Sequence, residues 1–121
     1  MIATALSALV SASLLALALG TVVSPRPLAE NYGLPVDEAT GIAYVRALGA
    51  RDGVLGLLVA WFLIRRSRGA LTATIGTATL IGLADFSLVR AVRPEARKSL
   101  SIHGSGVVGL TLLWLLLLRK P

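Results

Sequence analysis

The sequence predicts an all-α integral membrane four-helix bundle, and three observations support this fold class. Four blocks of mostly apolar residues are each about 20 residues long, enough at 1.5 Å per residue to cross a bilayer of about 30 Å. Of the 121 residues, 55% are hydrophobic and 15% are charged, whereas a soluble domain carries about 25% charged residues. The basic residues gather at the ends of the blocks, where their side chains can reach lipid headgroups.

The first predicted span covers residues 2–23, a block that contains no charged residue. The alternative is a cleaved signal peptide, which needs a basic N-terminal region and a shorter apolar core of about 7–15 residues. Small residues recur every four positions at Ala8, Ala12, Ala16 and Gly20. This spacing predicts a ridge on which a neighbouring helix packs closely.

We expect three further spans at residues 40–64, 70–89 and 100–118, so that residues 1–121 form one four-span transmembrane domain. The connections between the last three spans are short, which makes successive spans antiparallel neighbours. The connection at residues 24–39 is longer and contains three prolines, which fix φ and remove amide donors. It is predicted to be irregular chain outside the hydrocarbon that could fold back as a lid.

The net charge of +6 and the sequence pI near 11.2 would suit nucleic-acid binding, but the placement of the charges argues against it. Most of the basic residues lie at span ends, and no aromatic residues are interleaved with them to stack on bases. We therefore expect a lipid bilayer as the partner, and no nucleic acid. The absence of cysteine excludes a disulfide scaffold, a thiolate metal site and cysteine catalysis.

The positive-inside rule does not decide the orientation of the four spans, because five basic residues fall on each side of the membrane. Acidic residues cluster in the long connection, but acids have little influence on topology. We expect a bacterial inner membrane location with both termini in the cytoplasm.

The polar residues inside the spans converge on one half of the membrane. Arg46, Arg51 and Asp52 lie in the first half of the second span, Asp85 near the end of the third, and His103 near the start of the fourth. Because successive spans are antiparallel, all five residues are expected at a similar depth, on the side of the long connection.

Helical periodicity suggests which way these side chains face. Asp52 shares a face with Gly49, and Asp85 shares a face with other small residues, so both are suited to contact between helices. Arg51 is about 100° around the helix from Asp52. It is expected beside Tyr44, at an edge between the bundle and lipid or toward a second subunit.

Two interpretations of these residues remain open. Ionisable residues at membrane depth cost about 2.5–3.5 kcal/mol each on insertion scales, so they usually face the bundle interior and pair. In the structural interpretation, an arginine neutralises Asp52 or Asp85 and fixes the helix register. In the functional one, the carboxylates, histidine and arginines supply a proton acceptor, a proton donor and an anion clamp around one cavity. No metal site is expected, because His103 is the sole histidine and cysteine is absent.

Three segments carry a resemblance to known proteins: Tyr44-Val-Arg-Ala-Leu-Gly-Ala-Arg-Asp-Gly-Val-Leu-Gly56, Leu83-Ala-Asp85 and His103-Gly-Ser-Gly106. The chain resembles a family of small four-helix membrane proteins from bacteria and fungi. That family is catalogued as a domain of unknown function, with an Arg-Asp-x-x-Leu-Gly signature on the second helix. The resemblance implies the four-helix architecture and a shared polar core. It implies no particular reaction.

We expect a pocket on the side of the long connection that binds a small amphipathic molecule and catalyses acid–base isomerisation or cyclisation, with no cofactor. Asp52 is expected to act as the base, and His103 or Asp85 as the acid. The expected substrate-binding residues are Arg46, Arg51 and Tyr44.

The alternative is a non-enzymatic transport, binding or accessory bundle in which the charges pair helices. Four spans are few for a carrier that acts alone, so transport would require a homo-oligomer or another partner.

Overall fold

The computed structural model describes residues 1–119 and folds into five α-helices. They are α1 (Ile2–Val23), α2 (Pro25–Tyr32), α3 (Ala39–Ile64), α4 (Arg68–Val92) and α5 (Arg97–Leu118). Within these residues there is no strand, so the predicted all-α fold class is confirmed. Four of the helices, α1, α3, α4 and α5, are long and apolar enough to cross a membrane, which indicates an integral membrane protein. Lys120, one of the five basic residues counted on the side of the membrane that holds both termini, lies outside the described residues.

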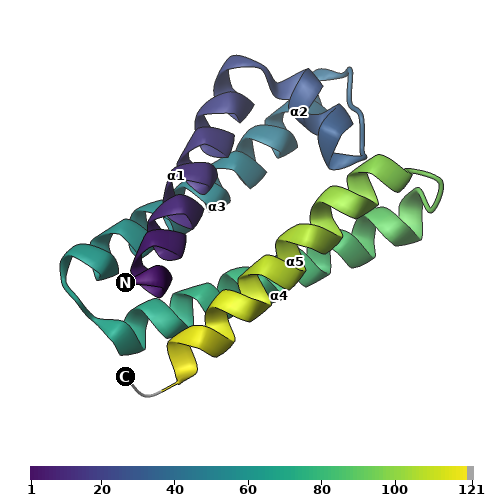
Figure 1. Cartoon of the computed structure of the whole chain (residues 1–121). Helices are drawn as coiled ribbons and strands as arrows, with labels where there is room; N and C mark the ends of the chain where they lie inside the picture. The colour runs from purple at the N-terminus through teal and green to yellow at the C-terminus, as the bar shows by residue number, and fades with distance from the viewer. Residues whose placement is uncertain (120–121) are drawn as a thin grey trace.

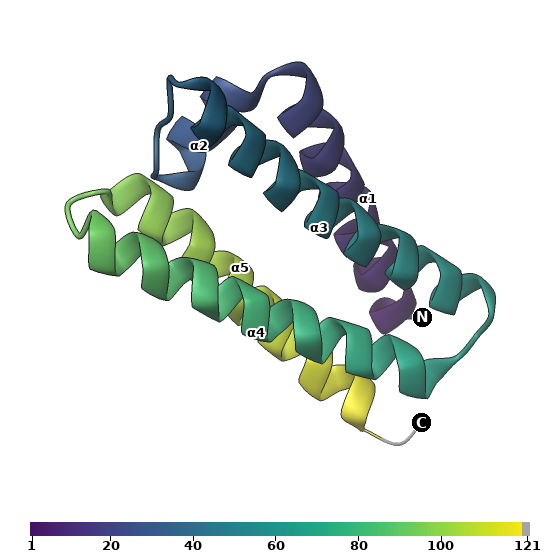
Figure 2. The ribbon, with the colours of Figure 1, turned by 180° about the vertical axis from the view of Figure 1, so that it is seen from behind.

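The long helices form two antiparallel pairs. α1 packs along α3, α4 packs along α5, and α3 also contacts α4 (Figures 1 and 2). The start of α1, the turn between α3 and α4 and the end of α5 lie at one end of the bundle, and α2 lies at the other (Figure 1). At the first end, a cluster of buried apolar side chains joins α3, α4 and α5, and its members are Val59, Leu71, Ile75, Leu113 and Leu117.

Glycines of α3 allow α1 to approach closely. A Cβ at Gly49 would collide with the side chain of Thr21, and a Cβ at Gly56 would lie 3.0 Å from Leu15. The buried hydroxyl of Ser11 donates a hydrogen bond of 2.7 Å to the carbonyl oxygen of Gly56. Helices inside a bilayer usually associate through small residues, which allow close contact, and through side-chain hydrogen bonds between the helices.

The face of α1 that makes this contact differs from the predicted one. Ala8, Ala12 and Ala16 are exposed, whereas Ser11 and Thr21 are buried against α3. The predicted ridge is therefore wrong at these three alanines. Both faces of α1 are lined by small residues, but a hydroxyl loses hydrogen bonds to water in an apolar environment. Burial against α3 gives Ser11 an acceptor that lipid would not offer.

The connection at residues 24–39 is only partly irregular, because it contains α2. Pro25 is the first residue of this helix, where the missing amide donor costs nothing. Gly33 ends it in the left-handed conformation, with φ of 105°, as glycine commonly does after a helix. A Cβ on Gly33 would lie 2.9 Å from side-chain atoms of both Val89 and Ser99. The end of α2 is therefore packed against α4 and α5.

A first prediction concerns topology. The chain contains no cysteine, so single cysteines can be introduced at two exposed positions. Gly69 lies at the start of α4 and Lys98 at the start of α5, and these two points are at opposite ends of the antiparallel pair. Gly69→Cys and Lys98→Cys should react with a membrane-impermeant maleimide from opposite sides of sealed vesicles. Labelling of both from the same side would contradict the four-span fold.

A second prediction concerns the contact between α1 and α3. Gly49→Ala should lower the free energy of unfolding by about 1–3 kcal/mol, because the added methyl overpacks the interface with Thr21. Gly109→Ala is the control, since nothing lies within 4 Å of its added methyl. The measurement is thermal or denaturant unfolding in micelles. Equal stability of the two variants would show that α1 and α3 do not pack through Gly49.

Candidate functional site

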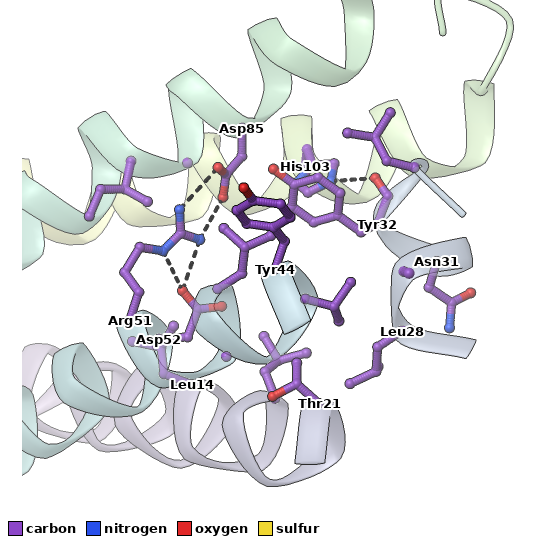
Figure 3. A pocket seen from close by; sticks show the side chains of 18 of the residues that line it. Leu14, Thr21, Leu28, Asn31, Tyr32, Tyr44, Arg51, Asp52, Asp85 and His103 are labelled. Carbon is purple, nitrogen blue, oxygen red and sulfur yellow. Dashed lines mark hydrogen bonds and ion pairs between the residues drawn. The ribbon is translucent and has the colours of Figure 1, made fainter. Parts of the chain in front are cut away.

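A cavity of about 540 Å³ lies between the two helix pairs, with lining residues from all five helices. Its volume falls within the range of about 300–1,000 Å³ that is typical of small-molecule sites. Most of the lining is apolar, and one part of the wall holds most of its ionisable side chains, whereas Thr21 and Asn31 lie apart from them (Figure 3). The polar part is built from Arg51 and Asp52 of α3, Asp85 of α4, His103 of α5 and Tyr32 of α2.

Arg51 lies between two carboxylates, one from its own helix and one from the neighbouring helix. Its Nη1 and Nη2 donate to Oδ1 and Oδ2 of Asp85 at 3.2 and 2.9 Å. Its Nε and Nη2 donate to Oδ1 of Asp52 at 3.1 and 3.0 Å. The bond to Asp85 is bidentate, the geometry in which arginine recognises a carboxylate best. It is an ion pair between the two helix pairs of the bundle.

The three groups of this ion cluster differ in what they leave free. Each nitrogen of Arg51 already donates to a carboxylate, and both oxygens of Asp85 accept from Arg51. In contrast, Oδ2 of Asp52 accepts no hydrogen bond from the residues that the structure describes. Asp52 is the more exposed carboxylate, at 20% against 15% for Asp85. Asp52 therefore has an unoccupied proton-accepting oxygen, which Asp85 lacks.

His103 holds α2 against α5. Its Nε2 lies 2.9 Å from the carbonyl oxygen of Tyr32, and because a carbonyl only accepts, this nitrogen must carry the proton. The rings of His103 and Tyr32 pack edge to face, with centroids 4.6 Å apart. In the neutral ring Nδ1 is then the bare nitrogen. The ion cluster and His103 line the same cavity, but no direct bond joins His103 to either carboxylate among the described residues.

The side chain of Tyr32 brings a further polar group to the cavity. Its hydroxyl is buried, has no hydrogen-bond partner among residues 1–119, and points toward Asp85 in Figure 3. Burial, followed by the nearby negative charge of Asp85, raises the pKa of Tyr32 above its ordinary value. Tyr32 therefore keeps its proton at neutral pH, and its hydroxyl has Asp85 as a nearby acceptor.

The structure brings most of the predicted site residues together. One cavity is lined by five of the six predicted residues: Tyr44, Arg51, Asp52, Asp85 and His103. The sixth, Arg46, is exposed and does not line the cavity. Arg46 is five residues from Arg51, which places the two side chains about 140° apart around the helix. Tyr44 is seven residues from Arg51, close to two full turns, so Tyr44 and Arg51 share one face. Arg51 was expected at an edge facing lipid or a second subunit. It faces the cavity instead, because Asp85 of the neighbouring helix lies opposite.

Sequence reasoning missed Tyr32, because the connection at residues 24–39 was predicted to be irregular. The signals for a short helix were present, with Pro25 at its first position and Gly33 after its last. Such a helix places Tyr32 beside the glycine that ends it. Nothing in the sequence alone directs that side chain toward Asp85.

The same geometry bears on a metal site. Within residues 1–119, no three histidine or carboxylate side chains come together in a way that could hold a metal ion. One oxygen of Asp52 and both oxygens of Asp85 are bonded to Arg51.

A third prediction concerns the ion cluster. Arg51→Lys keeps the positive charge but has one nitrogen in place of three, so it cannot bridge both carboxylates. We expect the free energy of unfolding in micelles to fall by about 1–3 kcal/mol, near the lower end because the Arg51 side chain is 30% exposed. Arg93→Lys, in the exposed pair with Glu95, is the control and should have no measurable effect. A fully stable Arg51→Lys variant would show that the bidentate bond does not hold the helix pairs together.

Comparisons with known proteins give a family but no reaction. No curated protein and no solved structure matches the chain. A family model described as "Domain of unknown function (DUF4267)" matches residues 11–118, which takes in the second half of α1, the other four helices and every residue of the ion cluster. The match confirms the resemblance that the sequence carries to a family of unknown function, and the chain belongs to the DUF4267 family.

Proposed function

We propose that the protein binds a small amphipathic molecule in the cavity between the helix pairs and catalyses its acid–base isomerisation or cyclisation. The observation that carries the proposal is a mostly apolar cavity whose wall presents an unoccupied carboxylate oxygen and a buried, unpartnered hydroxyl. An apolar pocket with a few convergent polar groups is the usual form of a small-molecule site. The apolar body of the ligand would lie against the leucines of α1 and α3.

Asp52 is the proposed base, through its Oδ2. Asp52 takes a proton from one atom of the ligand and returns it to another, so the elemental composition of the ligand is unchanged. The product is an isomer, or a ring where bond formation within the ligand accompanies the proton transfer. The Tyr32 hydroxyl donates a hydrogen bond to the ligand atom that gains electron density.

This assignment changes the roles that the sequence suggested for other residues. Asp85 is not retained as the acid, because both of its oxygens are bonded to Arg51. Arg51 is not retained as an anion clamp and serves instead to hold Asp52 in place. His103 acts on α2, through the carbonyl oxygen of Tyr32, and so positions the Tyr32 side chain.

The second candidate function is a non-enzymatic binding, transport or accessory bundle. The bidentate bond between Arg51 and Asp85 favours it, because this bond joins α3 to α4 and would be useful in a purely structural protein. Transport would in addition require a homo-oligomer. We also propose a bacterial inner membrane as the location, with both termini in the cytoplasm.

A fourth prediction tests catalysis. The protein in nanodiscs, incubated in D₂O with a lipid extract of the organism that encodes it, should convert at least one compound into an isomer that carries deuterium. Chromatography with mass spectrometry detects the changed retention, with a mass that differs from the starting compound only by the exchange of hydrogen for deuterium. Asp52→Asn should lower the rate at least about 100-fold, the usual contribution of a general base.

Two tryptophan variants of α4 provide the matched controls. Ile81→Trp fills the cavity that Ile81 lines and should abolish conversion. Leu80→Trp adds the same bulk at an exposed neighbouring position outside the cavity and should leave conversion intact. If the parent converts nothing, or if Asp52→Asn is fully active, the enzymatic proposal is rejected in favour of the non-enzymatic one.

A further inference from the structure

The charges that line the cavity do not balance. Among the described residues, the lining contains one cationic side chain, Arg51, and three carboxylates, Asp52, Asp85 and Glu38. With a neutral His103, the lining has an excess of two negative charges. One of the two charges is on Glu38, which is exposed and lies about 21 Å along α3 from Asp52, so the excess at the ion cluster itself is one negative charge, in a chain whose net charge is +6. An excess of one sign along an apolar wall attracts ligands of the opposite sign.

The hydrogen bonds of Arg51 weaken its attraction for an anion. Its Nε, Nη1 and Nη2 all donate to Asp52 or Asp85. A carboxylate or phosphate on the ligand would find only one of the five N–H groups of the guanidinium free, the second one on Nη1, because the other four donate to the two aspartates. It would also lie close to two side chains of its own charge, in surroundings where charge repulsion is stronger than in water.

A cation, in contrast, meets suitable groups at the same part of the wall. Oδ2 of Asp52 is unoccupied and can accept a hydrogen bond from an ammonium group. The aromatic rings of Tyr32 and Tyr44 also line this part of the cavity, and Figure 3 shows their hydroxyls directed toward Asp85. Aromatic faces attract cations, more strongly where water is excluded. The aromatic rings are an observation independent of the carboxylates.

We infer that the polar group of the ligand is a protonated amine on an otherwise apolar molecule, held between Asp52 and the rings of Tyr32 and Tyr44. This rests on the binding half of the proposed function and does not depend on the proton transfer. Glu38, the residue before α3, adds negative charge to the lining. The cavity therefore selects against fatty acids and phosphorylated lipids of similar length.

The test compares three probes with the same chain and different polar groups: decylamine, decanol and decanoate, at pH 8. Binding to the full chain in nanodiscs of neutral lipid is measured by titration calorimetry, and the signal of empty nanodiscs is subtracted. Decylamine should bind at least about tenfold more tightly than decanoate, with decanol between them. Asp52→Asn should remove most of this preference.

Glu30→Gln is the matched control, because it removes one negative charge from the exposed side of α2 without touching the cavity. It should keep the preference for the amine. If Asp52→Asn does not fold, Tyr44→Leu removes one of the two proposed rings at an exposed position of the lining and should weaken the preference for the amine in the same direction.

The outcomes separate this inference from the proposed function. Decanoate binding as tightly as decylamine, to a cavity that Ile81→Trp blocks, would overturn the amine assignment and leave a ligand-binding cavity in place. The amine assignment would also be overturned if Glu30→Gln and Asp52→Asn reduced the preference for the amine equally. The general charge of the surface would then be its cause. Binding of none of the three probes above empty nanodiscs would reject both the assignment and the proposed function.

Discussion

The ion pair between Arg51 and Asp85 is the constraint on which the rest of the site depends. A charged side chain at membrane depth must find a partner, and each of these residues finds the other across the boundary between α3 and α4. The bond fixes the two helices at one relative height. It also holds Asp52 at the cavity wall, because the same guanidinium bonds the adjacent carboxylate.

The cavity follows from how the other contacts are distributed. α1 and α3 meet through glycines and hydroxyls, and α4 packs along α5, so each pair of helices is close within itself. Between the pairs, the buried apolar cluster of Val59, Ile75 and Leu113 joins the helices at one end, and α2 covers the other (Figure 2). The ion cluster joins the pairs between those two ends. The space that remains open is lined mostly by apolar side chains, with the ion cluster and Tyr32 at one part of its wall.

The sequence predicted the part of this arrangement that depends on length, hydropathy and helical repeat. Those quantities gave the fold class, the four long helices and the shared depth of Asp52, Asp85 and His103. They could not give the contacts that depend on how neighbouring helices rotate. Arg51 was expected at an edge and Ala8 on a packed face, because periodicity says which residues share a face but not which face meets a neighbour. Tyr32 was missed because a proline-rich connection can be irregular or helical, and the choice here is made by packing of Gly33 against α4 and α5.

Gly33 has a consequence for how sequences of this family can change over time. A side chain at this position would be strained by a φ of 105° and would also collide with Val89 and Ser99. Two independent penalties act on one residue of a connection, a part of a chain where substitutions usually accumulate most freely. Among homologues that retain α2 in this place, glycine at this position should be kept, whereas the exposed alanines of α1 should be substituted freely. A kept glycine in this connection would then indicate that α2 packs against α4 and α5 in the same way.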